Sequence, residues 1–307
     1  MEDSIGGMRN SCLAGLLLLL AGATPALAQN SAPLDDALRT LLGADTARVS
    51  VVYLDRVHRT SLSLGGDRRL HAASTMKVPV LIELARRVAA GEFRWDDTLV
   101  VRNAFASIVD GSPYTLDPAD DSDSTLYLRE GQGVTLRELA ERMTARSSNL
   151  ATNLIITRLD PARVQATARL LGADSIMVRR GVEDGKAFRA GLSNTTTARD
   201  LARLLDAVAE GRAAGRETPA VVEMLLAQEF NSAIPAGLPP GTRVAHKTGW
   251  ITGITHDAAI IYPPGRRPFV LVVLTSGYES EAEAARRISE VAATAWRWAT
   301  TKPDPRE

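Results

Sequence analysis

The chain has 307 residues, 45% of them hydrophobic, which is enough for one large domain or two interlocked ones around a real core. Lysine and arginine together number 36, as do aspartate and glutamate, so no overall field favours nucleic acid or an anionic membrane as a partner. The sequence also lacks a zinc-finger, Walker or dinucleotide-binding fingerprint.

The N-terminus has the pattern of an export signal. Arg9 precedes the apolar run 13–21, and Ala26-Leu27-Ala28 then forms a cleavage site. We therefore predict that residues 1–28 are a signal peptide and that the mature protein is periplasmic or secreted. The apolar run is too short to cross a bilayer, so no membrane anchor is expected after cleavage. The only cysteine, Cys12, lies in the removed segment, which predicts a mature chain without disulfides.

Hydrophobic periodicity predicts strands near both ends of the chain and helices between them. An amphipathic helix is expected over 34–42, and two hairpin strands, 49–54 and 60–64, follow it. From 74 to about 227 the pattern is mostly helical, with helices expected at 136–144, 151–159, 162–171 and 197–210. Strands return at 243–247, 256–262 and 269–274, and a last helix is expected over 281–299.

This order of elements indicates an α+β fold in which a five-stranded antiparallel sheet is interrupted by a helical insertion. The corresponding domain prediction assigns 29–72 and 228–307 to the sheet domain and 73–227 to the helical domain. We expect a monomer.

The stretch HAASTMKVPV places Ser74 and Lys77 three residues apart at the start of a predicted helix. Residues at i and i+3 share a helix face, so the lysine could serve as the base that a serine nucleophile needs. A lysine can do this if burial or nearby positive charge lowers its pKa. Taken alone, a capping serine beside an exposed lysine is the commoner explanation, because S-x-x-K often arises by chance.

Other hydrolase patterns are missing. The G-x-S-x-G elbow is absent, and the four histidines follow no triad order. They also form no paired-histidine motif, so neither a metal nor another cofactor is expected.

Two further motifs change the interpretation of Ser74. Ser147-Ser148-Asn149 precedes a predicted helix, and Lys247-Thr248-Gly249 is expected to end a strand. In this order, S-x-x-K, S-x-N and K-T-G are the signature of the penicillin-recognising serine enzymes. The chain resembles that superfamily over nearly all its mature length, and the class A β-lactamases most closely.

The resemblance implies a sheet flanked by the N- and C-terminal helices, an inserted all-helical domain, and an active site between them. It implies that Ser74 attacks the β-lactam carbonyl, that Lys77 takes part in proton transfer, and that Ser147 relays a proton to the leaving nitrogen.

It further implies how the substrate is bound. Asn149 would bind the amide side chain, and Lys247 and Thr248 would meet the substrate carboxylate. The backbone N–H groups of Ser74 and Trp250 would form the oxyanion hole.

Deacylation in the family uses a glutamate, for which the candidate here is Glu183. The asparagine expected four residues later is replaced by Ala187, and Asn194 stands where an aspartate usually completes an ion-pair clasp. Asp184 is a rival base, and an ordinary solvated role for Glu183 stays open. Ser148 replaces the usual aspartate of the second motif.

The segment 110–131 contains six acidic residues and one arginine. It has no EF-hand spacing, so we expect a solvated loop rather than a calcium site. The resemblance implies an aromatic side chain from this loop at the rim of the site, either Tyr114 or Tyr127.

The predicted function is therefore an exported serine β-lactamase that acts on a small molecule through an acyl-enzyme on Ser74. Two alternatives remain open: a related DD-peptidase or esterase, and a penicillin-binding protein that deacylates poorly.

Overall fold

The computed structural model describes residues 31–56 and 60–301. The predicted signal peptide and Cys12 lie outside these residues. Within them, none of the helices combines the length and the apolar character that a membrane span requires.

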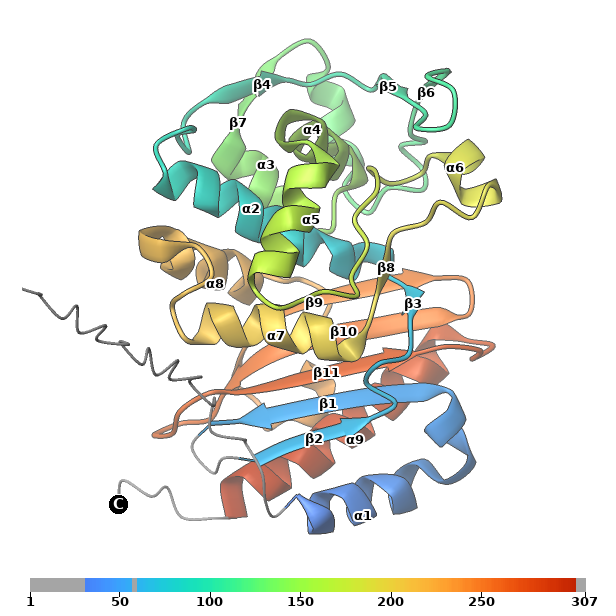
Figure 1. The fold of residues 1–307 in the computed structure, drawn as a ribbon, viewed down its shortest axis with the longest axis vertical. Helices are drawn as coiled ribbons and strands as arrows, with labels where there is room; N and C mark the ends of the chain where they lie inside the picture. The colour runs from blue at the N-terminus through green and yellow to red at the C-terminus, as the bar shows by residue number, and fades with distance from the viewer. Residues whose placement is uncertain (1–30, 57–59, 302–307) are drawn as a thin grey trace, which may run out of the picture.

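The centre of the fold is a five-stranded antiparallel sheet in the order β2-β1-β11-β10-β9, which confirms the predicted α+β class (Figure 1). Its strands are β1 (Val49–Asp55), β2 (Thr60–Leu64), β9 (Arg243–Ile251), β10 (Ile254–Tyr262) and β11 (Phe269–Thr275). The middle strand, β11, is buried at every position, because helices cover both faces of the sheet.

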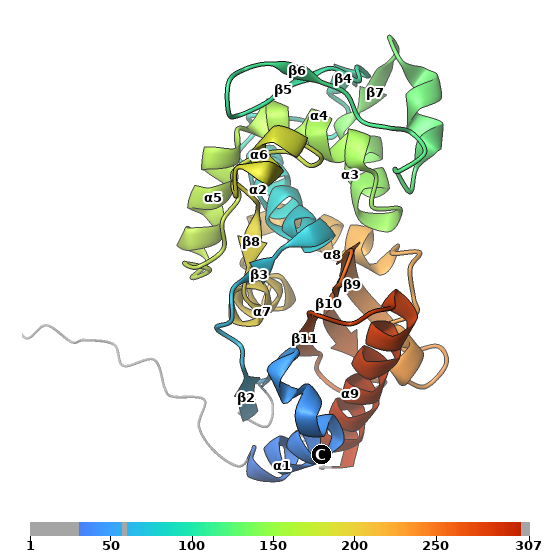
Figure 2. The same ribbon diagram turned by 90° about the vertical axis from the view of Figure 1, so that its right-hand side faces the viewer.

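The two faces of the sheet pack against different helices. Helices α1 (Ala32–Leu42) and α9 (Glu281–Thr301) cover one face, and α7 (Ala198–Ala209) covers the other, as Figure 2 shows with the sheet between α9 and α7. Alternate residues of each strand enter different cores: Val272 packs on the α7 side and Val273 on the α9 side.

The remaining helices gather around α2 (Lys77–Ala89), whose residues from Lys77 to Ala85 are all buried. It contacts α3 (Leu136–Ala145), α4 (Asn149–Leu159), α5 (Pro161–Leu170) and α8 (Thr218–Leu226). Because α2 begins beside the sheet and runs into this bundle, residues at its N-terminus lie where the two parts meet (Figure 2). The predicted domain boundaries stay a prediction.

Short elements connect the larger ones. β3 (Leu70–His71) pairs with β8 (Thr195–Thr196), β4 (Thr98–Val100) with β7 (Gly133–Thr135), and β5 (Phe105–Ala106) with β6 (Pro113–Tyr114). The short helices are α6 (Gly185–Arg189), η1 (Gly43–Ala47), η2 (Ala73–Met76), η3 (Ser124–Arg129), η4 (Gly215–Glu217) and η5 (Pro235–Gly237).

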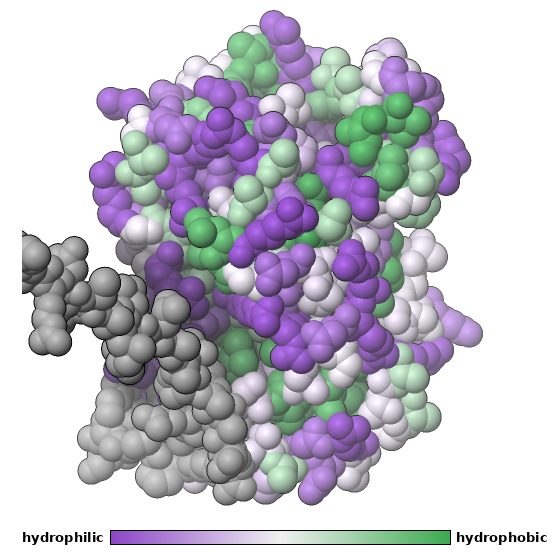
Figure 3. All heavy atoms as spheres, viewed as in Figure 1, coloured by the Kyte–Doolittle hydropathy of each residue, from purple (hydrophilic) through white to green (hydrophobic). Residues whose placement is uncertain are grey.

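Hydrophobic and hydrophilic side chains are mixed over most of the face shown in Figure 3. Its upper right, where Figure 1 places β6 and α6, carries more hydrophobic surface. Exposed apolar side chains of this region are Ile108 and Val109, between β5 and β6, and Phe188 of α6.

Candidate active site

The first motif begins in a 3₁₀ turn and enters α2 without a break. Ser74 belongs to η2, and Lys77 is the first residue of α2. Ala73 has a left-handed backbone (φ 44°), and its N–H donates to His71 Nδ1 at 3.0 Å. This turn leaves Ser74 half-buried at the wall of a pocket.

Lys77 is fully buried and directed toward the second motif. Its Nζ donates to the backbone oxygen of Ser147, to Ser147 Oγ at 3.0 Å and to Asn149 Oδ1 at 2.9 Å. Burial lowers the pKa of Lys77 to about 7, although the negative charges of Asp121 and Glu183 oppose the shift. A substantial neutral fraction can therefore accept a proton near neutral pH.

The second motif forms the start of α4. Ser147 is buried with φ 60°, and Ser148 caps the helix by accepting a hydrogen bond from the Ala151 N–H at 3.2 Å. The first helical residue, Asn149, donates through Nδ2 to Glu183 Oε1. One asparagine side chain thus connects the buried lysine with the candidate deacylation base.

The prediction that Lys247-Thr248-Gly249 ends a strand is wrong. β9 continues to Ile251, and the chain turns only at Thr252-Gly253, where Gly253 has φ 74°. A Cβ at Gly249 would lie 2.8 Å from the N of Ser74 and 2.9 Å from the N of Thr75. A glycine is therefore required for β9 to pass this close to the nucleophile turn.

Lys247 and Thr248 are buried beside this contact. Lys247 Nζ donates to the backbone oxygen of Thr248 at 3.0 Å. Burial, together with the charge of Lys77, lowers the pKa of Lys247 well below its usual value. Among the described residues Thr248 Oγ1 has no hydrogen-bond partner, so an amine and a hydroxyl with unused capacity lie on adjacent residues.

The two rival carboxylates differ in what they do. Asp184 is buried and accepts hydrogen bonds from Ser107 Oγ (2.9 Å), Ile108 N and Ala187 N (both 3.0 Å). Burial favours its neutral form, but these bonds outweigh burial, and the pKa of Asp184 is lowered. It thereby caps α6 and fastens the β5–β6 loop.

Glu183, in contrast, is exposed at the pocket with φ 62°. Partial desolvation raises the pKa of Glu183 even though the hydrogen bond from Asn149 opposes the shift. A raised pKa makes its carboxylate a better proton acceptor than an ordinary surface glutamate.

Side-chain hydrogen bonds close the loop that carries Glu183, and one of them runs from the buried Arg180 Nε to Leu192 O at 3.1 Å. Asn194 Oδ1 accepts from the N–H groups of Arg179 (2.8 Å) and Arg180 (3.3 Å), and its Nδ2 donates to Arg180 O (2.9 Å). Asn153 of α4 exchanges two further hydrogen bonds with the backbone of Val182. The sequence analysis noted Asn194 in place of the clasp aspartate but did not predict that its amide closes the loop, and it missed Asn153, because a single asparagine gives no motif signal.

The pocket has a volume of about 470 Å³. Each of the three motifs contributes a lining residue from within it or next to it: Ser74, Asn149 and Trp250. Glu183, His71 and Phe188 also line the pocket. Trp250 packs edge-on against Phe230 at 5.0 Å between ring centroids. The aromatic side chains that line this pocket are Phe188 and Trp250. Of the two tyrosines expected at the rim, Tyr114 donates to Val182 O beside Glu183 at 3.3 Å, and Tyr127 donates to Asp121 at 2.9 Å.

A family described as "Beta-lactamase enzyme family" matches residues 33–299. The chain belongs to this family. Beta-lactamase Toho-2 of Escherichia coli is 30% identical to it over 292 residues, which are 92% of this chain and 94% of that protein. As the resemblance implied, the chain is a class A-like serine hydrolase.

Solved structures place this β-lactamase-family protein in the same fold. A β-lactamase from Sphaerobacter thermophilus has a TM-score of 0.76 and 26% identity, covering 90% of this chain and all of that one. An ancestral class A β-lactamase (GNCA) has a TM-score of 0.73 and 28% identity, covering 86% of this chain and 99% of the other.

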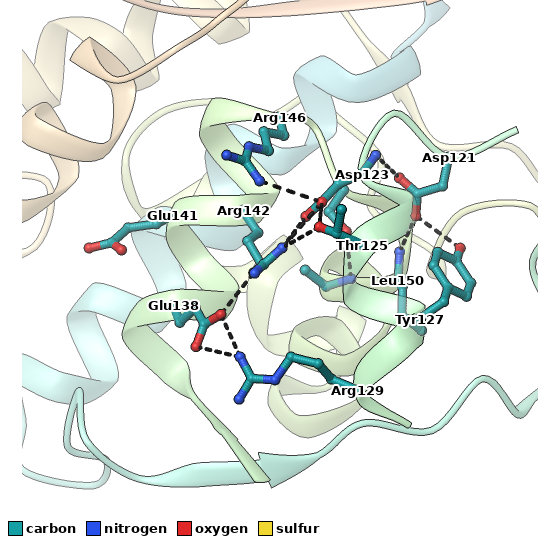
Figure 4. Close-up of polar contacts among 12 residues, drawn as sticks. Asp121, Asp123, Thr125, Tyr127, Arg129, Glu138, Glu141, Arg142, Arg146 and Leu150 are labelled. Atoms are coloured by element: carbon teal, nitrogen blue, oxygen red, sulfur yellow. Dashed lines mark hydrogen bonds and ion pairs between the residues drawn. The ribbon is translucent and has the colours of Figure 1, made fainter. Parts of the chain in front are cut away.

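The acidic segment is only partly the solvated loop that its composition suggested, since four of its six acidic side chains are exposed and two are buried. Asp121 and Asp123 are buried, with exposed fractions of 7% and 3%. Figure 4 shows Asp123 meeting Arg142 and Arg146, and Asp121 meeting the start of α4. Arginines thus pair with the charge of Asp123, whereas uncharged hydrogen-bond donors surround the carboxylate of Asp121.

Proposed function

We propose that this protein is an exported serine β-lactamase that hydrolyses the β-lactam amide through an acyl-enzyme on Ser74. The observation that carries the proposal is the continuous contact from Lys77 through Asn149 to Glu183. Through this contact a buried lysine of lowered pKa is linked to a carboxylate of raised pKa, and Asn149 and Glu183 share a pocket with Ser74.

Acylation begins when Ser74 Oγ attacks the β-lactam carbonyl carbon and neutral Lys77 takes the hydroxyl proton. The N–H groups of Ser74 and Trp250 stabilise the oxyanion. When the C–N bond breaks, Ser147 Oγ gives its proton to the leaving nitrogen and regains one from Lys77, to which it is hydrogen-bonded. The lysine is then neutral again, and the acyl group is esterified to Ser74.

Deacylation uses a water molecule activated by Glu183. The carboxylate takes a proton from the water, the resulting hydroxide attacks the ester carbonyl, and Ser74 leaves with that proton. Because Asp184 already accepts three hydrogen bonds, Glu183 is the carboxylate free for this step.

The substrate class follows from Lys247 and Thr248. A carboxylate placed between them would supply the acceptor that Thr248 Oγ1 lacks among the described residues and would restore the charge of Lys247. The natural penicillin and cephalosporin nuclei carry such a carboxylate beside the lactam.

The first test is a time course of nitrocefin hydrolysis with mass spectrometry of the protein. Sustained turnover with wild type, and neither adduct nor turnover with Ser74→Ala, is the expected result. Labelling by a fluorescent penicillin that persists in Ser74→Ala would refute the assignment of the nucleophile.

The second test separates the two carboxylates. Glu183→Gln should still be acylated and should accumulate the adduct, because an amide cannot accept the proton of the water. Asp184→Asn is the matched control and should not trap the adduct. If neither variant traps it while wild type turns over, Glu183 is not the base.

One observation favours an alternative function. Ala187 is buried in α6 and offers no side-chain hydrogen bond where the family has an asparagine. A wild-type burst of one equivalent without turnover would therefore indicate a penicillin-binding protein that deacylates poorly, and hydrolysis restricted to peptide or ester substrates would indicate a DD-peptidase or esterase.

We further propose that the protein is exported through residues 1–28, functions in the periplasm or outside the cell, and is a monomer. N-terminal sequencing and the mass in solution of the exported protein test these points. A retained residue 1 would refute signal cleavage.

A further inference from the structure

Asp121 is the most highly connected side chain of the acidic segment. Its Oδ1 accepts from Asp123 N at 3.0 Å, and its Oδ2 accepts from Tyr127 Oη at 2.9 Å. The carboxylate also accepts from Asn149 N (2.9 and 3.1 Å to the two oxygens) and from Leu150 N at 2.9 Å. Figure 4 shows the carboxylate between Tyr127 and the N–H of Leu150.

These contacts satisfy the first two amides of α4. The Ser148 hydroxyl accepts its hydrogen bond from Ala151 N. The capping residue therefore does not serve the N–H groups of Asn149 and Leu150. A carboxylate at a helix N-terminus is favoured by the helix dipole. Asp121 reaches this place from 28 residues earlier in the chain.

Asp121 is itself held in place by the rest of the segment. Asp123 accepts from Arg142 Nη1 at 2.9 Å and from Thr125 Oγ1 at 2.7 Å, which fastens the segment to α3. Tyr127 then fixes the Asp121 carboxylate from the other side. The carboxylate therefore has a defined position relative to α4.

Asp121 holds Asn149, which contacts both the lysine proposed for acylation and the glutamate proposed for deacylation. Asn149 accepts from Lys77 through Oδ1 and donates to Glu183 through Nδ2. Ser147, two residues earlier, has a left-handed backbone (φ 60°) that persists only where surrounding contacts determine it. Movement of α4's first turn would displace Ser147 and Asn149 together.

We propose that Asp121 is a positioning residue of the β-lactamase reaction, which fixes the Ser147–Asn149 turn and sets the charge around Lys77. The inference rests on the proposed function. It assigns a catalytic purpose to a segment that none of the three motifs includes.

The charge of Asp121 predicts a shift in the pH dependence of acylation, which a residue that acted by packing alone would not cause. The charged groups that face Lys77 are Asp121, Glu183 and Lys247. The negative charge of Asp121 raises the pKa of Lys77 and also that of Glu183. Its removal should lower both pKa values, so that the acid limb of the acylation profile moves to lower pH.

The test compares Asp121→Asn with Asp120→Asn in single-turnover acylation by nitrocefin as a function of pH, alongside thermal unfolding. Asp120 is adjacent and exposed, and its charge raises the pKa of Glu183 but does not act on Lys77. Acylation of Asp120→Asn should therefore match wild type. Asp121→Asn keeps the shape and loses the charge. Its acylation should slow by about tenfold to a hundredfold, as expected for a displaced catalytic group, with the acid limb at lower pH than in wild type.

An unshifted limb in Asp121→Asn, or acylation as fast as wild type, would overturn the proposal. Tyr127→Phe covers the case in which Asp121→Asn does not fold. It keeps the charge and removes one hydrogen bond, so acylation should slow without a shift of the limb, and wild-type acylation would count against positioning. Failure of the proposed function is distinguishable, because wild type itself would then form no adduct.

Discussion

Gly249→Ala should greatly reduce the acylation rate of this protein while it lowers the free energy of unfolding only slightly. The new Cβ would lie 2.8 Å from Ser74 N, 2.9 Å from Thr75 N and 3.2 Å from the Cβ of Ala73. The first two neighbours are backbone atoms of η2, which continues into the buried helix α2, so they cannot rotate away. β9 is the edge strand of the sheet, and we expect it to move outward instead.

The magnitude follows from which contacts that movement breaks. Overpacking of this kind usually costs ~1–3 kcal/mol of stability, and an edge strand that yields should place the cost near the lower end. The loss of one oxyanion donor reduces the rate by ~10²–10³, and the N–H of Trp250 moves with the strand. Acylation should therefore fall at least a hundredfold in a protein that is still folded.

The assay is pre-steady-state acylation by nitrocefin together with thermal unfolding. Gly133→Ala is the matched control, because its Cβ would meet Thr98 Cβ at 3.5 Å, an ordinary contact in the distant strand β7. Acylation by Gly249→Ala at the wild-type rate would refute the reasoning, since it would mean that β9 and η2 need not approach so closely. An equal loss in Gly133→Ala would show that the effect is not local.

Three further predictions follow from the site. Because burial lowers the pKa of Lys77 to about 7, the protonated amine predominates below that pH, and acylation should rise through a midpoint near it; a flat profile in stopped-flow measurements would contradict this. Lys247→Ala should reduce kcat/KM for carboxylated substrates by about tenfold to a hundredfold, which is the equivalent of a charge-assisted hydrogen bond of ~1.5–3 kcal/mol. The kcat/KM for neutral esters should not change. An equal loss of kcat/KM on carboxylated substrates and on neutral esters would instead indicate a structural role. Asn194→Ala removes three hydrogen bonds at the neck of the Glu183 loop, so mass spectrometry should detect more acyl-enzyme than in wild type, whereas an unchanged steady state would show that the neck does not support deacylation.

The main secondary structure was predictable from the sequence because it rests on periodic burial. The strand expected at 269–274 is β11, and the helix expected over 281–299 is α9 (Glu281–Thr301). The helix expected from 151 begins at Asn149, because Ser148 rather than a later residue caps it. Such errors of two residues arise where side chains, not hydrophobic spacing, decide the end of an element.

Other errors came from contacts between distant segments. The charge density of 110–131 suggested solvation, yet Asp121 and Asp123 are buried against α4 and α3. Nothing local in the sequence distinguishes them from Asp117 and Asp120, which are exposed. The partners of Asp121 and Asp123 are separated from them by up to 29 residues, a distance at which composition carries no information about pairing.

Strained backbone conformations also cluster at the candidate active site. Of the described residues other than glycine, four have positive φ, and three of them, Ala73, Ser147 and Glu183, border or belong to the catalytic group. Strained conformations persist where the surroundings over-determine them, and here the surroundings are His71 for Ala73, Asp121 through α4 for Ser147, and Asn149 for Glu183. Two of these three supports lie outside the S-x-x-K, S-x-N and K-T-G motifs. The motifs therefore specify which groups react, whereas side chains elsewhere in the chain hold those groups in the geometry that lets them react.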